Sequence, residues 1–176
     1  MICVMAYFTR RLEMNDSNQG LDLDATDLRI LELLQQDASG SNQDLAQQAH
    51  VSPATCLRRV KRLVDSGVIE RRVALLSPEK LGAGLSAIVE ITLDRQGAEH
   101  LQAFEARVLG EAAVQQCYQV TPGPDFVLIL QVPDMPAYQA LVLRLFTQDA
   151  NVRNVKAFFA THRAKFAPAV TLGATA

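Results

Sequence analysis

The residues of this 176-residue chain best suited to chemistry are basic and cluster between Leu57 and Arg72. Six basic side chains stand there against two acidic ones, a local charge of +4, although the whole chain carries −2. Charges are screened beyond about 8 Å at physiological salt, so a local cluster decides whether a polyanion is attracted. Guanidinium groups suit both phosphate oxygens and guanine edges. The cluster therefore indicates a nucleic-acid ligand.

A predicted helix positions most of this cluster. Ser52 is a suitable N-cap, Pro53 suits the first helical position, and Gly67 predicts the end. At about 100° per residue, three apolar residues share the side expected to face the core: Leu57, Val60 and Val64. The opposite side carries one hydroxyl and three guanidinium groups, which are expected to project outward together: Thr55, Arg58, Arg59 and Arg62.

Two shorter patterns precede this helix. The first predicted helix starts at Asp24, with Asp27 at the third position, and the second starts at Ser41, with Asp44 three residues later. A tight turn near His50 then leads into the third. This order predicts a helix-turn-helix domain whose last helix lies in a DNA groove. The expected DNA-binding residues are Ser52, Pro53, Ala54, Thr55, Arg58, Arg59 and Arg62. The alternative is a solvated basic face without a ligand.

The rest of the chain predicts a second domain. Residues 67–76 read as an extended segment, either a wing or a strand leading out, and residues 77–82 as a linker. Strand and helix patterns then alternate in the order βαββαβ, which predicts a ferredoxin-like fold over residues 83–168. One sheet face carries apolar residues such as Ile88 that no helix of this order covers, so a second copy of the chain is expected there. Residues 169–176 form a tail.

The loop from Thr121 to Asp125 connects two apolar strands and has two interpretations. It is either a tight turn that Asp125 caps, or a binding loop. In the second case, Gly123 exposes backbone donors and Asp125 offers a carboxylate, which together suit a zwitterionic amino acid.

Other site chemistry is not indicated. The three cysteines are isolated and odd in number, which fits a reducing cytoplasm, and the three histidines lack metal-ligand spacing. No phosphate-binding or nucleophile motif appears, so we expect no cofactor, no metal and no enzyme activity. No run of about 18 apolar residues could span a membrane. Residues 1–20 read as a flexible extension, with Met14 as an alternative start.

The chain resembles the Lrp/AsnC (feast/famine) family of transcription regulators. The resemblance rests on LDATDLRILELLQQD, on NQDLAQQAHVSPATCLRRVKRLVDSGVI, on ALLSPEKLG and on QVTPGPDFVLILQVPDMPAYQALV. It covers residues 21–168 and looks closest to the leucine-responsive branch. It implies a winged helix-turn-helix domain, residues 21–76, joined to an effector-binding (RAM) domain. It also implies dimers, tetramers or octamers that bind double-stranded DNA, with an amino acid bound between dimers.

The resemblance also implies an effector site. The residues it points to, together with those of the loop, are Gln119, Thr121, Gly123, Asp125, Met135 and Phe158. Pro122 departs from the family, which usually has Gly there; proline removes a backbone donor and leaves the effector's identity open. Sirohaem decarboxylase subunits resemble the same family and give an alternative, an enzyme, which would not need the basic helix.

Overall fold

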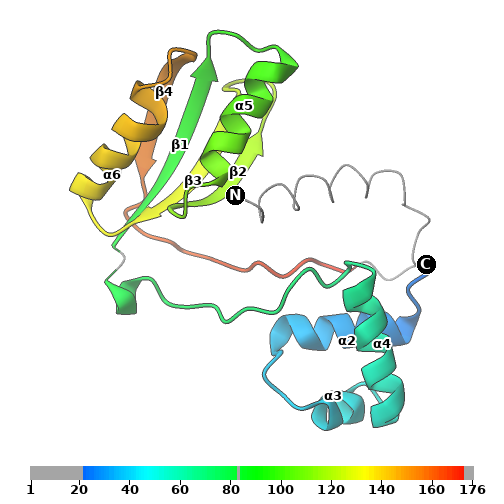
Figure 1. Ribbon diagram of the computed structural model, residues 1–176. Coiled ribbons are helices and arrows are strands. Elements are labelled where there is room, and N and C mark those ends of the chain that lie inside the picture. Colours follow the sequence, from blue (N-terminus) through cyan, green and yellow to red (C-terminus); the bar gives the residue numbers. More distant parts are fainter. Residues whose placement is uncertain (1–21, 83, 173–176) are drawn as a thin grey trace. The chain divides into compact units, whose positions relative to one another are not determined.

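The computed structural model describes residues 22–82 and 84–172 (Figure 1). The expected extension over residues 1–20, with its alternative start at Met14, lies outside this part. The described chain divides into two compact units. One contains residues 76–82 and 84–164, and the other contains residues 22–75 together with residues 165–172. Residues 165–168, expected in the second domain, therefore belong with the first, as does the described part of the tail.

The first unit is helical and contains α2 (Ala25–Gln36), α3 (Asn42–Gln48) and α4 (Pro53–Asp65). Reciprocal capping boxes start the first two helices: Asp24 pairs with Asp27, and Ser41 pairs with Asp44. Ser52 caps α4 ahead of Pro53. These caps satisfy backbone N–H groups that have no partner inside a helix. The three predicted helix starts are therefore confirmed.

The buried face of α4 differs from the one expected. Seven residues form the core of this unit: Ile30, Leu31, Ala46, Ala49, Cys56, Val60 and Leu63. Leu57 and Val64 are instead 60% and 46% exposed, so their expected core role is wrong. The helix is rotated by about one position, and Cys56 and Leu63 flank Val60 on the inner side. Cysteine packs as a small apolar side chain, so Cys56 can occupy a core position beside Val60.

The segment after α4 forms no wing. Gly67 ends the helix with a φ of 76°, a conformation that glycine adopts without strain. Residues 70–77 then contain neither helix nor strand. Three apolar side chains of this segment are largely exposed: Val73, Leu75 and Leu76. A short 3₁₀ helix, η1 (Glu79–Leu81), follows.

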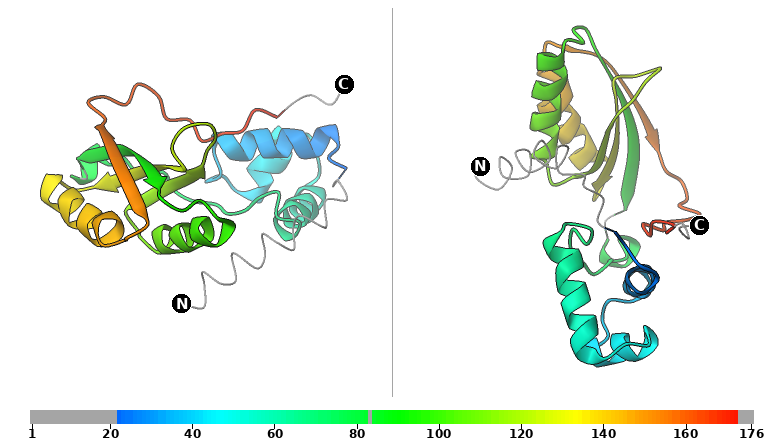
Figure 2. Two further views of the ribbon diagram at one scale, coloured as in Figure 1. Left: turned by 90° about the horizontal axis from the view of Figure 1, so that it is seen from above. Right: turned by 90° about the vertical axis from the view of Figure 1, so that its right-hand side faces the viewer.

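The second unit has the predicted ferredoxin-like fold. It contains β1 (Leu85–Leu93), α5 (Ala98–Leu109), β2 (Val114–Gln119), β3 (Phe126–Val132), α6 (Met135–Val142) and β4 (Val152–Phe159), with a π-helical turn, η2 (Leu143–Thr147), after α6. The strands form one antiparallel sheet in the order β2-β3-β1-β4. Both helices cover the same face of the sheet, as the right-hand view of Figure 2 shows.

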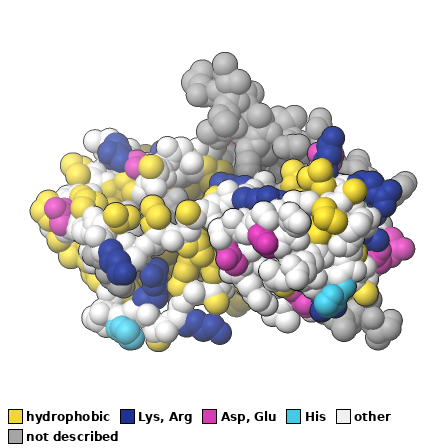
Figure 3. All heavy atoms as spheres, turned by 90° about the horizontal axis from the view of Figure 1, so that it is seen from below, with side chains coloured by type: hydrophobic (Ala, Val, Ile, Leu, Met, Phe, Trp, Pro, Cys, Tyr) yellow, Lys and Arg dark blue, Asp and Glu magenta, His cyan; other side chains and the backbone are white. Residues whose placement is uncertain are grey.

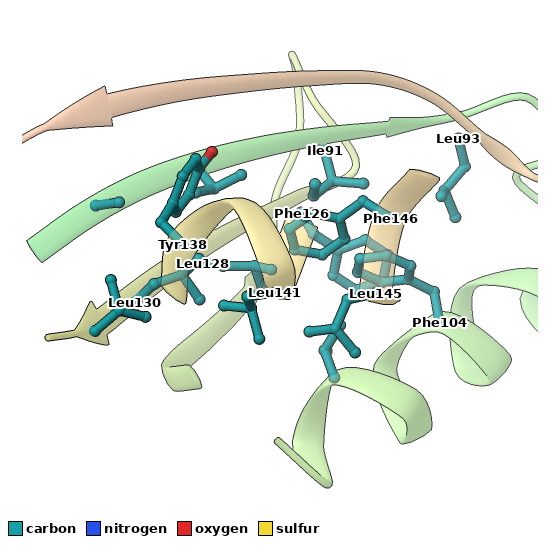
Figure 4. Packing of buried hydrophobic residues seen from close by; sticks show 14 residues of the cluster. Ile91, Leu93, Phe104, Phe126, Leu128, Leu130, Tyr138, Leu141, Leu145 and Phe146 are labelled. Atoms are coloured by element: carbon teal, nitrogen blue, oxygen red, sulfur yellow. The ribbon is translucent and has the colours of Figure 1, made fainter. Parts of the chain in front are cut away.

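The core of the second unit lies between the sheet and these two helices (Figure 4). Phe104 of α5 packs against Phe126 and Phe146, with ring centroids 4.7 and 6.3 Å away. Alternate residues of β1 and β3 point into this core, and the residues between them face the other side. The strands' period of two therefore leaves one sheet face open. No helix in the described part of the chain is long and apolar enough to cross a lipid bilayer.

Candidate nucleic-acid interface and effector loop

The start of α4 is open and locally rigid. Ser52, Pro53 and Ala54 are exposed, whereas Thr55 is half-buried. The Ser52 hydroxyl donates to Thr55 Oγ1 at 2.9 Å and accepts the Thr55 backbone N–H at 3.2 Å. Asn42 Nδ2 donates to the Pro53 carbonyl at 2.9 Å, which ties the start of α3 to the start of α4. The four residues expected nearest to the bases thus lie together at a helix start that hydrogen bonds hold in place. Asn42 also positions this helix start, and it was not among the predicted site residues.

Arg59 does not project outward as expected. Its Nη1 lies 2.7 Å from Asp24 Oδ2 and 2.9 Å from Asp27 Oδ1, and only 22% of its side chain is exposed. These two carboxylates raise the pKa of the Arg59 guanidinium above its ordinary value. The expectation is wrong because Asp24 and Asp27, assigned only to capping, also face α4 from the start of α2.

The Arg62 side chain is partly buried in an ion pair and partly exposed to solvent. Its Nη2 pairs with Asp27 Oδ2, while 46% of its side chain stays exposed. Asp27 itself is completely buried. Burying a carboxylate is costly unless cations and hydrogen bonds compensate it, and here two guanidinium groups and the Asp24 backbone N–H do so. Asp27 therefore anchors α4 to α2.

Two cations on α4 remain available. Arg58 and Lys61 are exposed, and no ion pair is recorded for either among the described residues. The predicted exposure of Arg58 is confirmed, whereas Lys61 was not among the predicted DNA-binding residues. Lys61 lies three residues beyond Arg58, which places both on one stretch of the helix surface. Arg71 and Arg72 are also exposed in the segment that follows.

The loop between β2 and β3 is closed by hydrogen bonds through Asp125. Val120 N–H donates to the Asp125 carbonyl at 3.1 Å, and Asp125 N–H donates to the Ile91 carbonyl at 2.8 Å. One carboxylate oxygen of Asp125 accepts from Leu93 N–H at 2.6 Å. The interpretation of a tight turn held by Asp125 is therefore supported. The other carboxylate oxygen has no recorded partner in the described chain, so a binding role is compatible with it.

Glycine is required in this loop by its backbone conformation. Gly123 has a φ of 129°, which side-chain-bearing residues rarely adopt, and no atom lies within 4 Å of where a Cβ would stand. Conformation rather than crowding therefore selects glycine. Thr121 and Gly123 are both exposed at the tip of the loop.

The six predicted effector residues do not meet in one subunit. Gln119, Thr121, Gly123 and Asp125 lie at the end of the sheet where β3 begins, whereas Met135 follows the other end of β3. Phe158 lies on β4, at the opposite edge of the sheet from β2. Three strand spacings of about 4.8 Å separate these edges, a distance of about 14 Å. A free amino acid is too small to contact both edges of one sheet.

Comparisons with known proteins fit these two units. A family model described as winged helix-turn-helix DNA-binding matches residues 23–70, and one described as Lrp/AsnC ligand binding domain matches residues 86–170. The leucine-responsive regulatory protein of Salmonella typhimurium is 42% identical over 123 residues, 70% of this chain and 75% of that protein. The Bkd operon transcriptional regulator of Pseudomonas aeruginosa is 36% identical, over 79% of this chain and 91% of that protein.

Solved structures agree. A transcriptional regulator from Neisseria meningitidis, in complex with L-methionine, has a TM-score of 0.79 and 31% identity over 85% of this chain and 96% of that one. An AsnC family regulator from Agrobacterium tumefaciens has a TM-score of 0.79 and 32% identity over 84% and 96% of the two chains.

The fold and these matches define a transcription regulator with a helix-turn-helix domain and a ligand-binding domain. The chain belongs to the Lrp/AsnC family. The relatives named above are transcription regulators, and nothing in them supports the alternative of a sirohaem-decarboxylase-like enzyme.

Proposed function

We propose that this regulator binds specific double-stranded DNA as a homodimer or larger oligomer, with α4 in the major groove. The observation that carries this proposal is the exposed start of α4, Ser52 to Ala54, beside two exposed cations, Arg58 and Lys61. Helix N-terminal residues reach base edges in helix-turn-helix proteins, and arginine fits guanine or phosphate. Arg62 contributes its exposed part, and Arg59 positions the helix. Binding to chromosomal DNA would place the protein in the cytoplasm.

The open sheet face supports a dimer. Ile88 of β1, Tyr118 of β2 and Phe158 of β4 are 42%, 52% and 43% exposed, and they lie on the face that α5 and α6 leave uncovered. On the side of the molecule seen in Figure 3, apolar side chains (yellow) lie at the surface among Lys and Arg side chains (dark blue). Several exposed apolar residues on one face mark an interaction surface. In a two-fold dimer, the same surface of a second copy would cover it. Two copies paired there would form the dimer.

An amino acid bound between subunits would regulate DNA binding. The loop residues Thr121, Gly123 and Asp125 offer backbone donors and a carboxylate, which match the two charged ends of an amino acid. Met135 at the start of α6 and Phe158 of β4 offer apolar surface, but both lie away from the loop within one subunit. A site that contains both groups of residues needs two copies of the chain. Assembly into tetramers or octamers would bring such copies together, so ligand binding would shift assembly.

Selection of bound sequences from a random duplex library, with the purified full-length chain, tests DNA recognition. We expect an enriched, imperfectly palindromic site, because a two-fold dimer presents two α4 helices about 34 Å apart. Enrichment of no sequence would contradict the proposal. A thermal-shift screen of the twenty amino acids tests the effector, since a ligand of the native state raises the melting temperature. A flat screen would contradict the effector role alone.

A further inference from the structure

The C-terminal segment Lys165–Leu172, here called the strap, is fixed to α2 by a two-way pairing. Gln35 Nε2 donates to the Val170 carbonyl at 3.1 Å, and Val170 N–H donates to Gln35 Oε1 at 2.6 Å. A side-chain amide that donates to and accepts from one backbone residue imitates the pairing of two strands. This pairing sets the register of the strap on the helix, across 135 residues of sequence.

The strap also reaches the helical core. Leu172 is half-buried and packs against the cluster that contains Ile30, Leu31 and Leu63. Val170, in contrast, keeps 69% of its surface exposed. The apolar packing of Leu172 and the backbone pairing of Val170 thus both hold the end of the strap on the helical unit. Figures 1 and 2 show this C-terminal segment, coloured red, alongside α2, coloured blue.

The chain that leads into the strap starts from the sheet. β4 ends at Phe159, and the next residue, Ala160, donates its N–H to the Ser86 carbonyl of β1 at 2.9 Å. Only the residues between Ala160 and Val170 connect this hydrogen-bonded sheet edge to Gln35 of α2. The polypeptide thus links the ligand-binding unit to the DNA-binding unit twice, once after α4 and once through the strap.

The helix that receives the strap is the helix that holds α4. Gln35 and Asp27 stand eight residues apart on α2, about 12 Å along one rigid helix. Asp27 in turn is bonded to Arg59 and Arg62 of α4. A continuous series of contacts therefore runs from the strap through α2 to the candidate recognition helix.

We propose that the strap couples the ligand-binding unit to α4, by acting on α2 and its Asp27 anchor. The regulatory part of this inference rests on the proposed function, whereas its structural part does not. The strap stabilises one arrangement of α2, and a change at the end of β4 alters how firmly the strap is held. A claim of coupling needs a measured effect at both ends, and the following two experiments supply one each.

Hydrogen–deuterium exchange on the full-length chain tests the structural part without DNA or ligand. Leu172→Asp removes the apolar anchor, and Gln35→Ala removes the backbone pairing. Both variants should speed exchange of amides in α4 as well as in α2, because local stability depends on the contacts that hold each element. Thr171→Asp and Gln36→Ala, exposed neighbours of the two residues, should leave exchange unchanged. Unchanged exchange in α4 of both strap variants would overturn the inference.

A lengthened strap tests the transmission. A flexible Gly-Ser insertion of about six residues between Thr161 and His162 keeps every docking residue but slackens the connection. Operator affinity without ligand should stay that of the unmodified chain. The change in operator affinity caused by L-methionine or L-leucine should fall about fivefold or more. A full response in the insertion variant would overturn the transmission.

The two proposals fail in different ways. If the unmodified chain neither binds DNA nor responds to these two amino acids, the proposed function fails, and the exchange experiment still decides whether the strap controls α4.

Discussion

Arg59 Nη1 of α4 lies 2.9 Å from Asp27 Oδ1 of α2, and the carboxylate at the far end of this ion pair is completely buried. The pair fixes how α4 lies on its own domain. It also removes one guanidinium from the surface that faces DNA in the proposal. The cations of α4 thus differ in role. Arg59 and part of Arg62 hold the helix on its domain, whereas Arg58 and Lys61 have no recorded ion pair within residues 22–82 and 84–172.

Replacing the anchor should destabilise the DNA-binding domain. Asp27→Asn leaves two guanidinium groups facing a neutral side chain, and breaking a buried ion pair costs about 3–5 kcal/mol. We expect a loss of this size in the free energy of unfolding, measured by denaturant titration of the full-length chain. Glu32→Gln, an exposed change on the same helix, is the matched control. Equal midpoints for the two variants would show that Asp27 anchors nothing.

Removing a free cation should weaken DNA binding without loss of stability. Arg58→Ala should cost about 1–3 kcal/mol of operator binding free energy if the guanidinium reads a base. If it binds only a phosphate, affinity should fall evenly across sequences, with a smaller salt dependence. Arg95→Ala removes the same charge from the ligand-binding unit and serves as control. Mobility-shift titrations at two salt concentrations make the comparison, and identical curves for the two variants would contradict the interface.

Acid should loosen the start of α2. The Asp27 backbone N–H and then the Arg59 guanidinium lower the pKa of Asp24 below its ordinary value of 3.8. Because the pKa is lowered in the folded state, Asp24 stabilises the fold fully above about pH 4, and this stabilisation is lost as the pH falls through the lowered value. Asp24→Asn should therefore flatten the fall in stability below about pH 4, followed by circular dichroism. Asp22→Asn should not, and matching slopes would refute the assignment.

A charge on the open sheet face should separate the subunits. Ile88→Asp places a carboxylate in the middle of the proposed dimer surface, where burial without a partner costs about 3 kcal/mol or more, about a hundredfold in the dimerisation constant. Sedimentation equilibrium should then show monomers at concentrations where the unmodified chain is assembled. Gln102→Asp adds the same charge to the exposed surface of α5 and should leave assembly intact. A fully assembled Ile88 variant would place the interface elsewhere.

Loss of charge in the loop should abolish the ligand response. Asp125→Asn keeps an oxygen to accept the Leu93 N–H but removes the negative charge offered to an ammonium group. We expect operator affinity to persist and the amino-acid-induced rise in melting temperature to disappear. Asp94→Asn, an exposed change beside the same loop contact, is the control. A normal thermal shift in the Asp125 variant would leave the loop with its structural role only.

Local patterns were enough to predict the elements. The three helix caps and the βαββαβ order follow from residue types a few positions apart, and the structure confirms them. Tyr138, Leu141 and Phe146 of α6 and η2 are buried at helical spacing, because a helix under a sheet buries one continuous stripe.

The same reasoning failed where packing partners decide. Leu57 and Val64 looked like core residues of α4, but Cys56 and Leu63 took their place. The helical period defines the buried face of a helix only to within one residue position, because a small side chain such as Cys56 can pack in the core as well as a large one. Packing against the neighbouring helices decides which face of α4 is buried, and the α4 sequence alone does not contain that information.

What the sequence by itself determined is thus local: where each helix and strand begins, and which cluster of residues carries positive charge. Tertiary structure alone decided which of those charges are free. Asp27 meets Arg59 and Arg62 across more than 30 residues, and Val170 meets Gln35 across 135. Such pairs depend on the relative placement of whole elements, which burial of apolar surface fixes and no short-range spacing encodes.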